Sequence, residues 1–325
     1  MRLKPFACLL PLLSTLIFVS TTAHAVILRD TATRNTSAPT GILAGSGWQF
    51  EGKWGDYNAT PIAPNFFLAA AHVGGKVGDV FTYNGQSYTT IGATGEAGSD
   101  LAVWQVRETF TAYASVYTGS SEVGKDTMIF GRGTARGDEV HVPAGDASPS
   151  TLRGWGWGAN DTVPSWGENQ VSGIAVSTAG DGSVRQFLAL PFSQTGVGGS
   201  TLSAGDSSGG VFINDGGVWK LAGINYGVDG NYSQTANGNY FGGAVFDKRG
   251  LYEGTSSDNF FWANSGPSIS SDSYATRISS RFAFIQSATQ GQVVPEPGAW
   301  LLMAVGVGAV TLAQRVRNLR KSAAA

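Results

Sequence analysis

The sequence predicts an all-β fold, and three features of residues 26–293 carry that prediction. The chain is rich in small turn-forming residues, with 46 Gly among its 325 residues. Short apolar stretches of strand length, such as "NFFLAAAHV", "DLAVWQV" and "GGVFIN", recur between Gly, Asn, Asp and Pro. They do not alternate with long amphipathic helices, and no fixed-period repeat is present. A β-sandwich or a pair of β-barrels is therefore favoured over a βαβ fold.

The first 25 residues have the pattern of a cleaved export signal. Arg2 and Lys4 precede an apolar run, and Ala23-His24-Ala25 fits the small-x-small cleavage pattern. We therefore expect an exported mature protein that begins at Val26. The only cysteine, Cys8, lies inside the signal, so the mature protein is predicted to form no disulfide.

The carboxy-terminal residues 294–325 have a different character. "VPEP" is followed by an apolar run over 298–313, which is slightly short of the roughly 17–25 residues of a spanning helix. A basic cluster follows, as the positive-inside rule expects. This arrangement resembles the PEP-CTERM sorting signal of Gram-negative envelope proteins. The resemblance implies transient membrane anchoring through 298–313, processing by an exosortase-type enzyme, and a location in the envelope or outside the cell.

The charge balance of the mature domain excludes one class of partner. Removing both ends leaves 15 basic and 22 acidic residues, so the domain is acidic. Nucleic-acid phosphates would repel such a surface, and we expect no nucleic-acid partner.

One helix is predicted near the end of the domain. In "YATRISSRFAFIQSA", Ile278, Phe282 and Ile285 fall at i, i+4 and i+7 and form one apolar face. The pattern predicts a helix over about 275–288.

The stretch "GDSSGG", residues 205–210, fits two different hydrolases. As G-x-S-x-G it matches the nucleophile elbow of α/β-hydrolase esterases, in which the catalytic histidine follows the serine. No histidine follows Ser207, which argues against the esterase. Outside the signal only His72 and His141 remain as bases for a hydroxyl nucleophile. His141, in the polar stretch "DEVHVPAG", is expected at the surface.

The opposite order, His then Asp then Ser, is present with suitable local sequence. His72 ends the apolar stretch "AAAHV", and Asp100 opens the alternating stretch "SDLAVWQV". A carboxylate beneath the imidazole and a serine in front of it form a catalytic triad. Asp79 and Asp126 are the alternative carboxylates.

These blocks resemble those of the trypsin-like serine proteases, T-A-A-H-C, D-I-A-L-L and G-D-S-G-G-P. "LAGINYG" is similar to the family's L-V-G-I-V-S-W-G strand, and "YATRISSRFAFIQ" to its carboxy-terminal helix. The resemblance implies two Greek-key β-barrels of the chymotrypsin type, at about 40–135 and 136–274, followed by the helix. It also implies a serine endopeptidase that acts on protein or peptide substrates and needs no metal or organic cofactor.

Two adjacent serines leave the nucleophile open between Ser207 and Ser208. Laid without a gap on the family motif, the stretch places Gly205 two residues before Ser207, where the backbone N–H must point at the developing oxyanion in a conformation that Gly adopts most easily. We therefore favour Ser207. Ser208 then replaces a glycine of the motif.

The resemblance implies roles for further residues. The backbone N–H groups of Gly205 and Ser207 would form the oxyanion hole, and Asp206 would pair with a newly freed amine at Val26. Thr201 would lie at the base of the specificity pocket; because it carries no charge, we expect no strong preference for Arg or Lys. The strand residues implied for the pocket wall are Asn225, Tyr226 and Gly227. The alternative function is a catalytically inactive, protease-like binding module at the cell surface.

Overall fold

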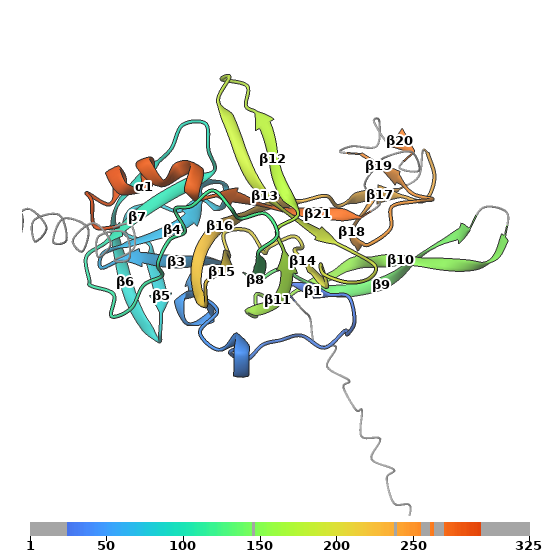
Figure 1. Cartoon of the computed structure of the whole chain (residues 1–325), viewed down its shortest axis with the longest axis horizontal. Helices are drawn as coiled ribbons and strands as arrows, with labels where there is room; N and C mark the ends of the chain where they lie inside the picture. Colours follow the sequence, from blue (N-terminus) through green and yellow to red (C-terminus); the bar gives the residue numbers. More distant parts are fainter. Residues whose placement is uncertain (1–24, 145–146, 237–238, 255–260, 263–269, 294–325) are drawn as a thin grey trace, which may run out of the picture.

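The structure is a computed structural model, and it describes residues 25–144, 147–236, 239–254, 261–262 and 270–293 (Figure 1). Except for Ala25, the predicted export signal lies outside these residues, and so does the whole predicted PEP-CTERM segment with its apolar run 298–313. Within the described ranges, no helix combines the length and the apolar character needed to cross a membrane.

The amino-terminal half forms a closed six-stranded β-barrel in the order β2-β3-β4-β7-β6-β5. Its interior is filled largely by aromatic rings; Phe67 and Phe81, for example, stack with their centroids 4.4 Å apart. The stretch "FFLAA" forms β4 with all five residues buried, because one face packs inside the barrel and the other against the second half of the molecule. The strands are β2 (Gly52–Trp54), β3 (Tyr57–Ala63), β4 (Phe66–Ala70), β5 (Val80–Tyr83), β6 (Gln86–Gly95) and β7 (Leu101–Val106).

The second half is built on a seven-stranded sheet in the order β11-β8-β15-β16-β21-β13-β12. This sheet curls, but among the described residues its backbone ladder does not close. At the open seam the buried side chain of Asn169 on β11 donates hydrogen bonds to the carbonyl oxygens of Pro191, at 3.0 Å, and Ser200, at 2.7 Å. The strands are β8 (Asp126–Gly131), β11 (Ser165–Gln170), β12 (Gly173–Thr178), β13 (Val184–Phe192), β15 (Gly210–Asp215), β16 (Val218–Val228) and β21 (Ser271–Arg277).

A six-stranded accessory sheet, which the sequence did not predict, extends from this half (Figure 1). Its long β9–β10 hairpin projects from the body of the molecule. Trp157 lies so close to Gly230 and Gly242 that a Cβ atom on either glycine would come within 2.6 Å of the indole. The strands are β9 (Thr134–Ala144), β10 (Ala147–Asn160), β17 (Asn231–Ser233), β18 (Phe241–Val245), β19 (Tyr252–Glu253) and β20 (Phe261–Trp262).

The carboxy-terminal helix is shorter than predicted. Residues 275–277 continue β21, because they pair with β13 and β16 instead of coiling. A 3-10 turn, η5 (Ser279–Arg281), leads into α1 (Phe282–Ala288). The predicted apolar face is present: Ile278 and Ile285 are fully buried, and Phe282 packs against the same core.

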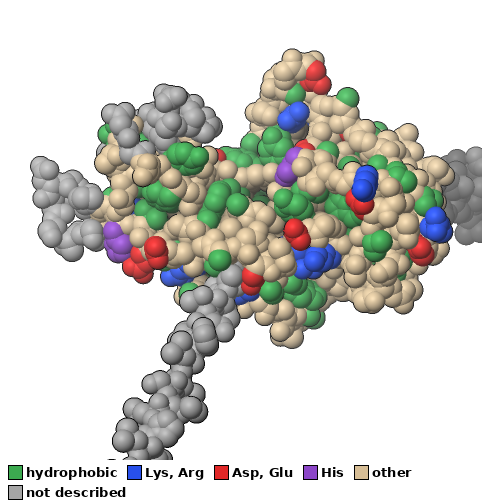
Figure 2. Space-filling model, turned by 180° about the vertical axis from the view of Figure 1, so that it is seen from behind, with side chains coloured by type: hydrophobic (Ala, Val, Ile, Leu, Met, Phe, Trp, Pro, Cys, Tyr) green, Lys and Arg blue, Asp and Glu red, His purple; other side chains and the backbone are tan. Residues whose placement is uncertain are grey.

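The predicted all-β, chymotrypsin-type fold with a carboxy-terminal helix is thus confirmed; the first half is a closed barrel, and the second half is a seven-stranded sheet whose ladder is open among the described residues. Between the two halves lies an apolar core that includes Leu68 and Leu101 from the barrel and Phe130 and Phe212 from the sheet. A short strand, β1 (Ile27–Leu28), pairs with β14 (Ser200–Thr201) and fixes this segment on the second half. On the face seen in Figure 2, charged side chains are scattered rather than gathered.

We predict that Asn169→Ala destabilises the second half of the molecule. The substitution leaves two carbonyl oxygens at the seam without their donor, which should lower the free energy of unfolding by about 1–3 kcal/mol. Urea denaturation measures the change, and Gln86→Ala, on an exposed strand position, is the control. An unchanged midpoint for Asn169→Ala would show that the seam does not depend on this amide.

Candidate active site

His72 lies between Asp100 and Ser207 in hydrogen-bonding contact with both. Its Nδ1 atom is 2.6 Å from Asp100 Oδ2, and its Nε2 atom is 2.8 Å from Ser207 Oγ. An imidazole that donates its Nδ1 proton to a carboxylate keeps Nε2 as an acceptor, which is the tautomer that can receive the serine proton. The structure therefore brings together the three residues of the predicted triad.

The register of two strands explains why His72 meets Asp100. β4 pairs with β7 so that Ala70 lies opposite Leu101. The chain then turns through η3 (Ala71–Val73), and the turn is fastened to Asp100: Ala71 N donates to its carbonyl oxygen at 2.8 Å, and His72 N to its Oδ1 at 3.0 Å. Backbone and side chain of one aspartate thus hold the histidine in place.

The two adjacent serines have different surroundings. Ser207 is half-buried and faces His72. Ser208 is fully buried, and its Oγ accepts a hydrogen bond of 2.9 Å from the backbone N–H of Ala70. Its φ angle of +70° lies in the left-handed region, which is costly for any residue with a Cβ atom. The Ser208 hydroxyl is therefore part of the contact between the two halves and does not face the histidine.

The serine loop, residues 205–209, leaves two N–H groups available beside Ser207. Among the described residues, neither Gly205 N nor Ser207 N donates a hydrogen bond within the protein. Gly205 has a φ of +93°, and an added Cβ would lie 2.4 Å from the Asn160 side chain, so only glycine fits. The unbonded N–H groups of a serine and of the residue two positions before it can stabilise an oxyanion.

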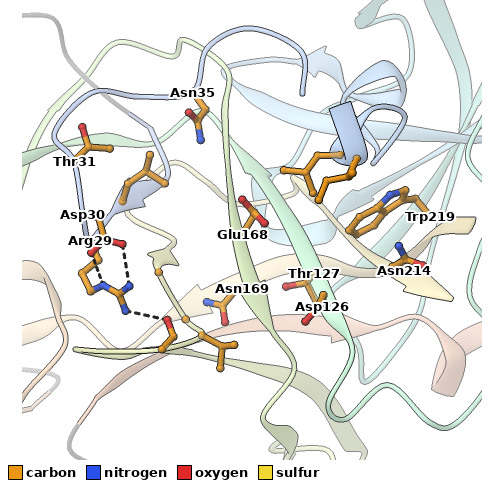
Figure 3. A pocket seen from close by; sticks show the side chains of 17 residues that line it. Arg29, Asp30, Thr31, Asn35, Asp126, Thr127, Glu168, Asn169, Asn214 and Trp219 are labelled. Carbon is orange, nitrogen blue, oxygen red and sulfur yellow. Dashed lines mark hydrogen bonds and ion pairs between the residues drawn. The ribbon is translucent and has the colours of Figure 1, made fainter. Parts of the chain in front are cut away.

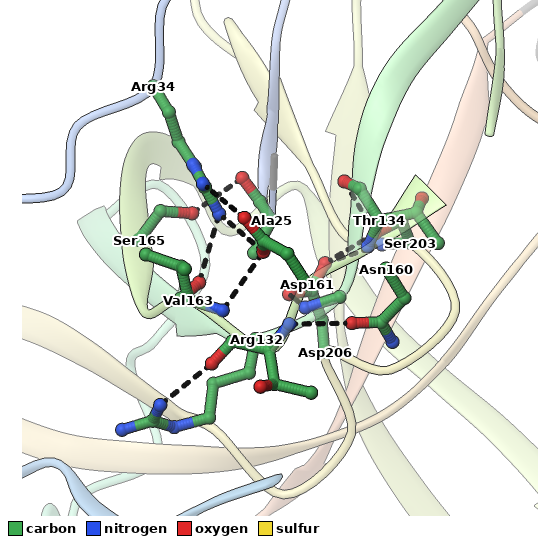
Figure 4. A network of polar contacts seen from close by, with 12 residues as sticks. Ala25, Arg34, Arg132, Thr134, Asn160, Asp161, Val163, Ser165, Ser203 and Asp206 are labelled. Atoms are coloured by element: carbon green, nitrogen blue, oxygen red, sulfur yellow. Dashed lines mark hydrogen bonds and ion pairs between the residues drawn. The ribbon is translucent and has the colours of Figure 1, made fainter. Parts of the chain in front are cut away.

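Asp206 is completely buried and lies at the centre of a hydrogen-bond network (Figure 4). Its carboxylate accepts hydrogen bonds of 2.7 Å from Gly133 N and from Ser203 N, and one of 2.8 Å from Ser203 Oγ. The Val26 amide nitrogen approaches it at 3.3 Å. Burial raises the pKa of Asp206 to about 6, although these donors oppose the rise. The predicted proximity of residue 26 and Asp206 is thus seen while Ala25 is still attached to Val26.

Asn225 supports the serine loop rather than lining an open pocket. It is fully buried, and its Nδ2 donates to the carbonyl oxygens of Asp206, at 2.9 Å, and Phe130, at 2.7 Å. Its backbone carbonyl accepts from Ser208 N and its N–H donates to Gly209 O. Asn225 therefore holds the residues on both sides of Ser207, a role that sequence reasoning missed because the fastening is made by contacts between strands.

The other residues predicted for the specificity pocket lie along the same strand and on β14. The Tyr226 ring is 6.2 Å from the imidazole of His72, edge to face. Gly227, the next residue, has open space where a Cβ atom would be. Thr201 is buried, and its Oγ1 is 2.8 Å from Ser273 Oγ on β21.

The alternative acids and the second histidine lie elsewhere. Asp79 accepts from Lys76 N, and Asp126 from the side chain of Gln170. His141 pairs with Glu139 on the β9–β10 hairpin. In the part of the chain that the structure describes, no group of His, Cys, Asp and Glu is arranged to hold a metal ion.

A large surface cavity of about 650 Å³ lies away from the triad (Figure 3). It is open to solvent and is lined by the amino-terminal arm, residues 196–199 and the ends of β8, β11 and β15; its lining includes Glu168, Asn214 and Trp219. Arg29, on its wall, forms an ion pair with Asp30. None of the three triad residues lines this cavity.

Comparison with known proteins gives structural likeness only. No protein-family model matches the chain, and no curated protein matches its sequence. An inactive form of Rv3671c from M. tuberculosis is similar over 81% of this chain and 100% of its own, at 10% identity and a TM-score of 0.43. Neuropsin, a serine protease of mouse brain, is similar over 75% and 96%, at 11% identity and 0.41. The HtrA-type protease AlgW is similar over 73% and 52%, at 15% identity and 0.38.

We predict that the Ser208 hydroxyl stabilises the fold. Ser208→Ala removes the acceptor of the buried Ala70 N–H and keeps the strained φ, so it should cost about 1–3 kcal/mol of unfolding free energy. Ser208→Gly also loses the acceptor but relieves roughly 1 kcal/mol of strain, and should cost less. Thermal and urea unfolding of both variants measure the difference. An alanine variant as stable as the wild type would show that the hydrogen bond contributes nothing.

Proposed function

We propose that the chain is an exported serine endopeptidase that hydrolyses peptide bonds through Ser207, His72 and Asp100. The observation that carries the proposal is the imidazole of His72, which contacts Asp100 Oδ2 through one nitrogen and Ser207 Oγ through the other. A buried strand end and a serine loop from different halves of the molecule converge on this one ring. Such convergence is the requirement for a general base acting on a hydroxyl nucleophile.

The proposed reaction follows from these contacts. His72 Nε2 takes the Ser207 proton as Oγ attacks the substrate carbonyl, and Asp100 stabilises the imidazolium that forms. The N–H groups of Gly205 and Ser207 donate to the oxyanion of the tetrahedral intermediate. His72 then gives its proton to the leaving amine, and water hydrolyses the acyl-enzyme by the same route in reverse.

The proposed substrate is a protein or peptide that lies along β16 near Tyr226 and Gly227. Thr201, without charge, supports the expectation of no strong preference for Arg or Lys. Export through the first 25 residues and transient anchoring through 294–325, with removal by an exosortase-type enzyme, belong to the same proposal and rest on the sequence patterns. No cofactor is required by the proposed chemistry.

A fluorophosphonate probe tests the nucleophile directly. We expect one covalent adduct on Ser207, located by fragment-ion mass spectrometry because Ser207 and Ser208 share every tryptic peptide. Ser207→Ala and His72→Ala should each reduce acylation and peptide hydrolysis by about 10⁴-fold or more, since the triad acts as a unit. His141→Ala, which removes the other described histidine, is the matched control.

Three results separate the alternatives. No adduct on the folded wild-type protein would favour the inactive binding module. An adduct on Ser208 would overturn the choice of serine, and hydrolysis at the wild-type rate by both Ser207→Ala and His72→Ala would refute the triad.

The contact between Val26 and Asp206 supports a second part of the proposal: cleavage after Ala25 activates the enzyme. A free amine at Val26 would bring a positive charge to the buried carboxylate of Asp206, next to Ser207. With Ala25 attached, the folded-state pKa of Asp206 is about 6, above the ordinary 3.8. The folded protein then binds more protons than the unfolded chain between these values, so its stability falls as pH rises from about 4 to 6.

We predict that a chain beginning at Val26 reacts faster with the probe than one beginning at Ala25. It should also lose less stability between about pH 4 and 6, because the ammonium group favours the ionised carboxylate. Asp206→Asn should abolish both differences. Acylation rates and thermal melts across this pH range provide the measurements. Equal rates and equal melts for the two chains would contradict activation by cleavage.

A further inference from the structure

A buried carboxyl group that the proposed triad does not use lies between the two halves of the molecule. Glu51 follows the 3-10 turn η2 (Trp48–Phe50). The residue keeps some exposed surface, but its carboxyl group is enclosed, and Oε2 is buried. The other oxygen, Oε1, accepts from Thr60 Oγ1 at 3.1 Å and from Gly210 N at 3.2 Å. Burying a carboxyl group lowers the stability of the folded protein unless its hydrogen bonds compensate, so such a group points to a specific role.

The two donors belong to different halves. Thr60 lies on β3 of the closed barrel, whereas Gly210 begins β15 of the seven-stranded sheet and comes three residues after Ser207. A Cβ atom on Gly210 would lie 2.6 Å from Glu51 Oε1, so the close approach requires glycine. Next to this contact, Phe50 stacks on Phe212 with centroids 6.1 Å apart. Glu51 therefore joins the end of the serine loop to the barrel that carries His72.

A second series of contacts leads from β3, near Glu51, through Arg132 to Asp206 in the serine loop. Arg132 Nε donates to Asn58 Oδ1 at 2.6 Å, and Arg132 Nη1 to Thr162 O at 2.8 Å. Asn58 lies on β3 two residues before Thr60, and its side chain also lies close to Glu51, whose pKa it lowers. The residue after Arg132, Gly133, donates its N–H to Asp206 in the serine loop.

The charge state of Glu51 is poised near neutral pH. Burial raises its pKa to about 8, although the donors Thr60, Gly210 and Asn58 and the nearby charge of Arg132 lower it. The titratable groups that face it are Arg132, from the connection between β8 and β9, and Tyr83, from β5. At pH 7 the carboxyl is therefore mostly neutral, and above pH 8 it becomes a buried anion close to an arginine.

We propose that Glu51 is a positioning residue that holds the serine loop against the closed barrel, and that its ionisation strengthens this hold. The donors Thr60 Oγ1 and Gly210 N bind a carboxylate more strongly than a neutral acid, which is why they lower the pKa of Glu51. The end of the serine loop at Gly210 is then held more tightly when Glu51 is ionised. The effect on catalysis rests on the proposed function; the effect on the loop does not.

The rate of acylation by the fluorophosphonate probe, measured between about pH 6 and 9.5, tests the catalytic part. Glu51→Gln keeps an acceptor oxygen but cannot ionise, so we expect it to match the wild-type rate near pH 6 and to fall below it above about pH 8, where the wild-type carboxyl is ionised. Thr60→Val should lower the rate at every pH, and Glu168→Gln, an exposed glutamate, should follow the wild type. A Glu51→Gln profile that superimposes on the wild-type profile would overturn the proposal.

Amide hydrogen exchange of Gly210 tests the positioning without requiring activity. In Glu51→Ala the amide loses its acceptor, and we expect it to exchange at least about tenfold faster than in the wild type at pH 7. If Glu51→Ala does not fold, Thr60→Val and the wild type compared at pH 6.5 and 9, after correction for intrinsic exchange, provide the same test. Unchanged protection of Gly210 refutes the role of Glu51, whereas an unlabelled wild type with a responsive Gly210 refutes only the endopeptidase.

Discussion

The fastening of His72 to Asp100 is the constraint on which the candidate site depends. Three contacts join the short turn after β4 to this one aspartate: Ala71 N to its carbonyl oxygen, His72 N to Oδ1 and His72 Nδ1 to Oδ2. They exist because β4 and β7 pair with Ala70 opposite Leu101. A shift of this register by one residue would turn every side chain of β4 to the opposite face and separate the ring from the carboxylate. The closed barrel therefore fixes the orientation of the imidazole before any part of the second half is involved.

The serine arrives from the second half, so the site exists only as long as the two halves keep their spacing. An apolar core provides most of the attraction between them but has no preferred direction. Direction comes from polar contacts across the interface, among them Ala70 N to Ser208 Oγ and Gly210 N to Glu51 Oε1. Both follow Ser207 along the chain, one by one residue and the other by three. Asn225 completes the support from within the second half by holding Asp206, Ser208 and Gly209.

Short stretches of sequence were enough to propose the candidate site residues and the strands around them. The order of His72, Asp100 and Ser207, the strand character of their surroundings and the preference for Ser207 over Ser208 all came from short stretches of sequence. The contacts of Ser208 and Asn225 were not predictable in this way, because their partners are distant in the sequence. Ala70 lies 138 residues from Ser208, and Phe130 lies 95 residues from Asn225. For the same reason residues 275–277 were assigned to a helix: their apolar spacing fits one, but two neighbouring strands offer them ladder hydrogen bonds. The accessory sheet was not predicted as a unit, because its β9–β10 and β17–β18 hairpins are joined only by the pairing of β10 with the distant strand β18.

Without disulfides, the contacts between the sheets must come from packing, hydrogen bonds and ion pairs. One buried ion pair joins β21 to the connection between the two halves. Glu122, fully buried, accepts from Arg277 at 2.8 Å through each carboxylate oxygen, and Ser279 donates to it as well. Burial raises the pKa of Glu122, but these donors outweigh it, so the net pKa is lowered and the carboxylate stays ionised. A buried pair of this kind contributes little net stability compared with apolar packing, yet losing one partner leaves an uncompensated charge and costs several kcal/mol. The pair ties the end of β21 to the connection between the halves, next to the strand β16 that holds the serine loop through Asn225.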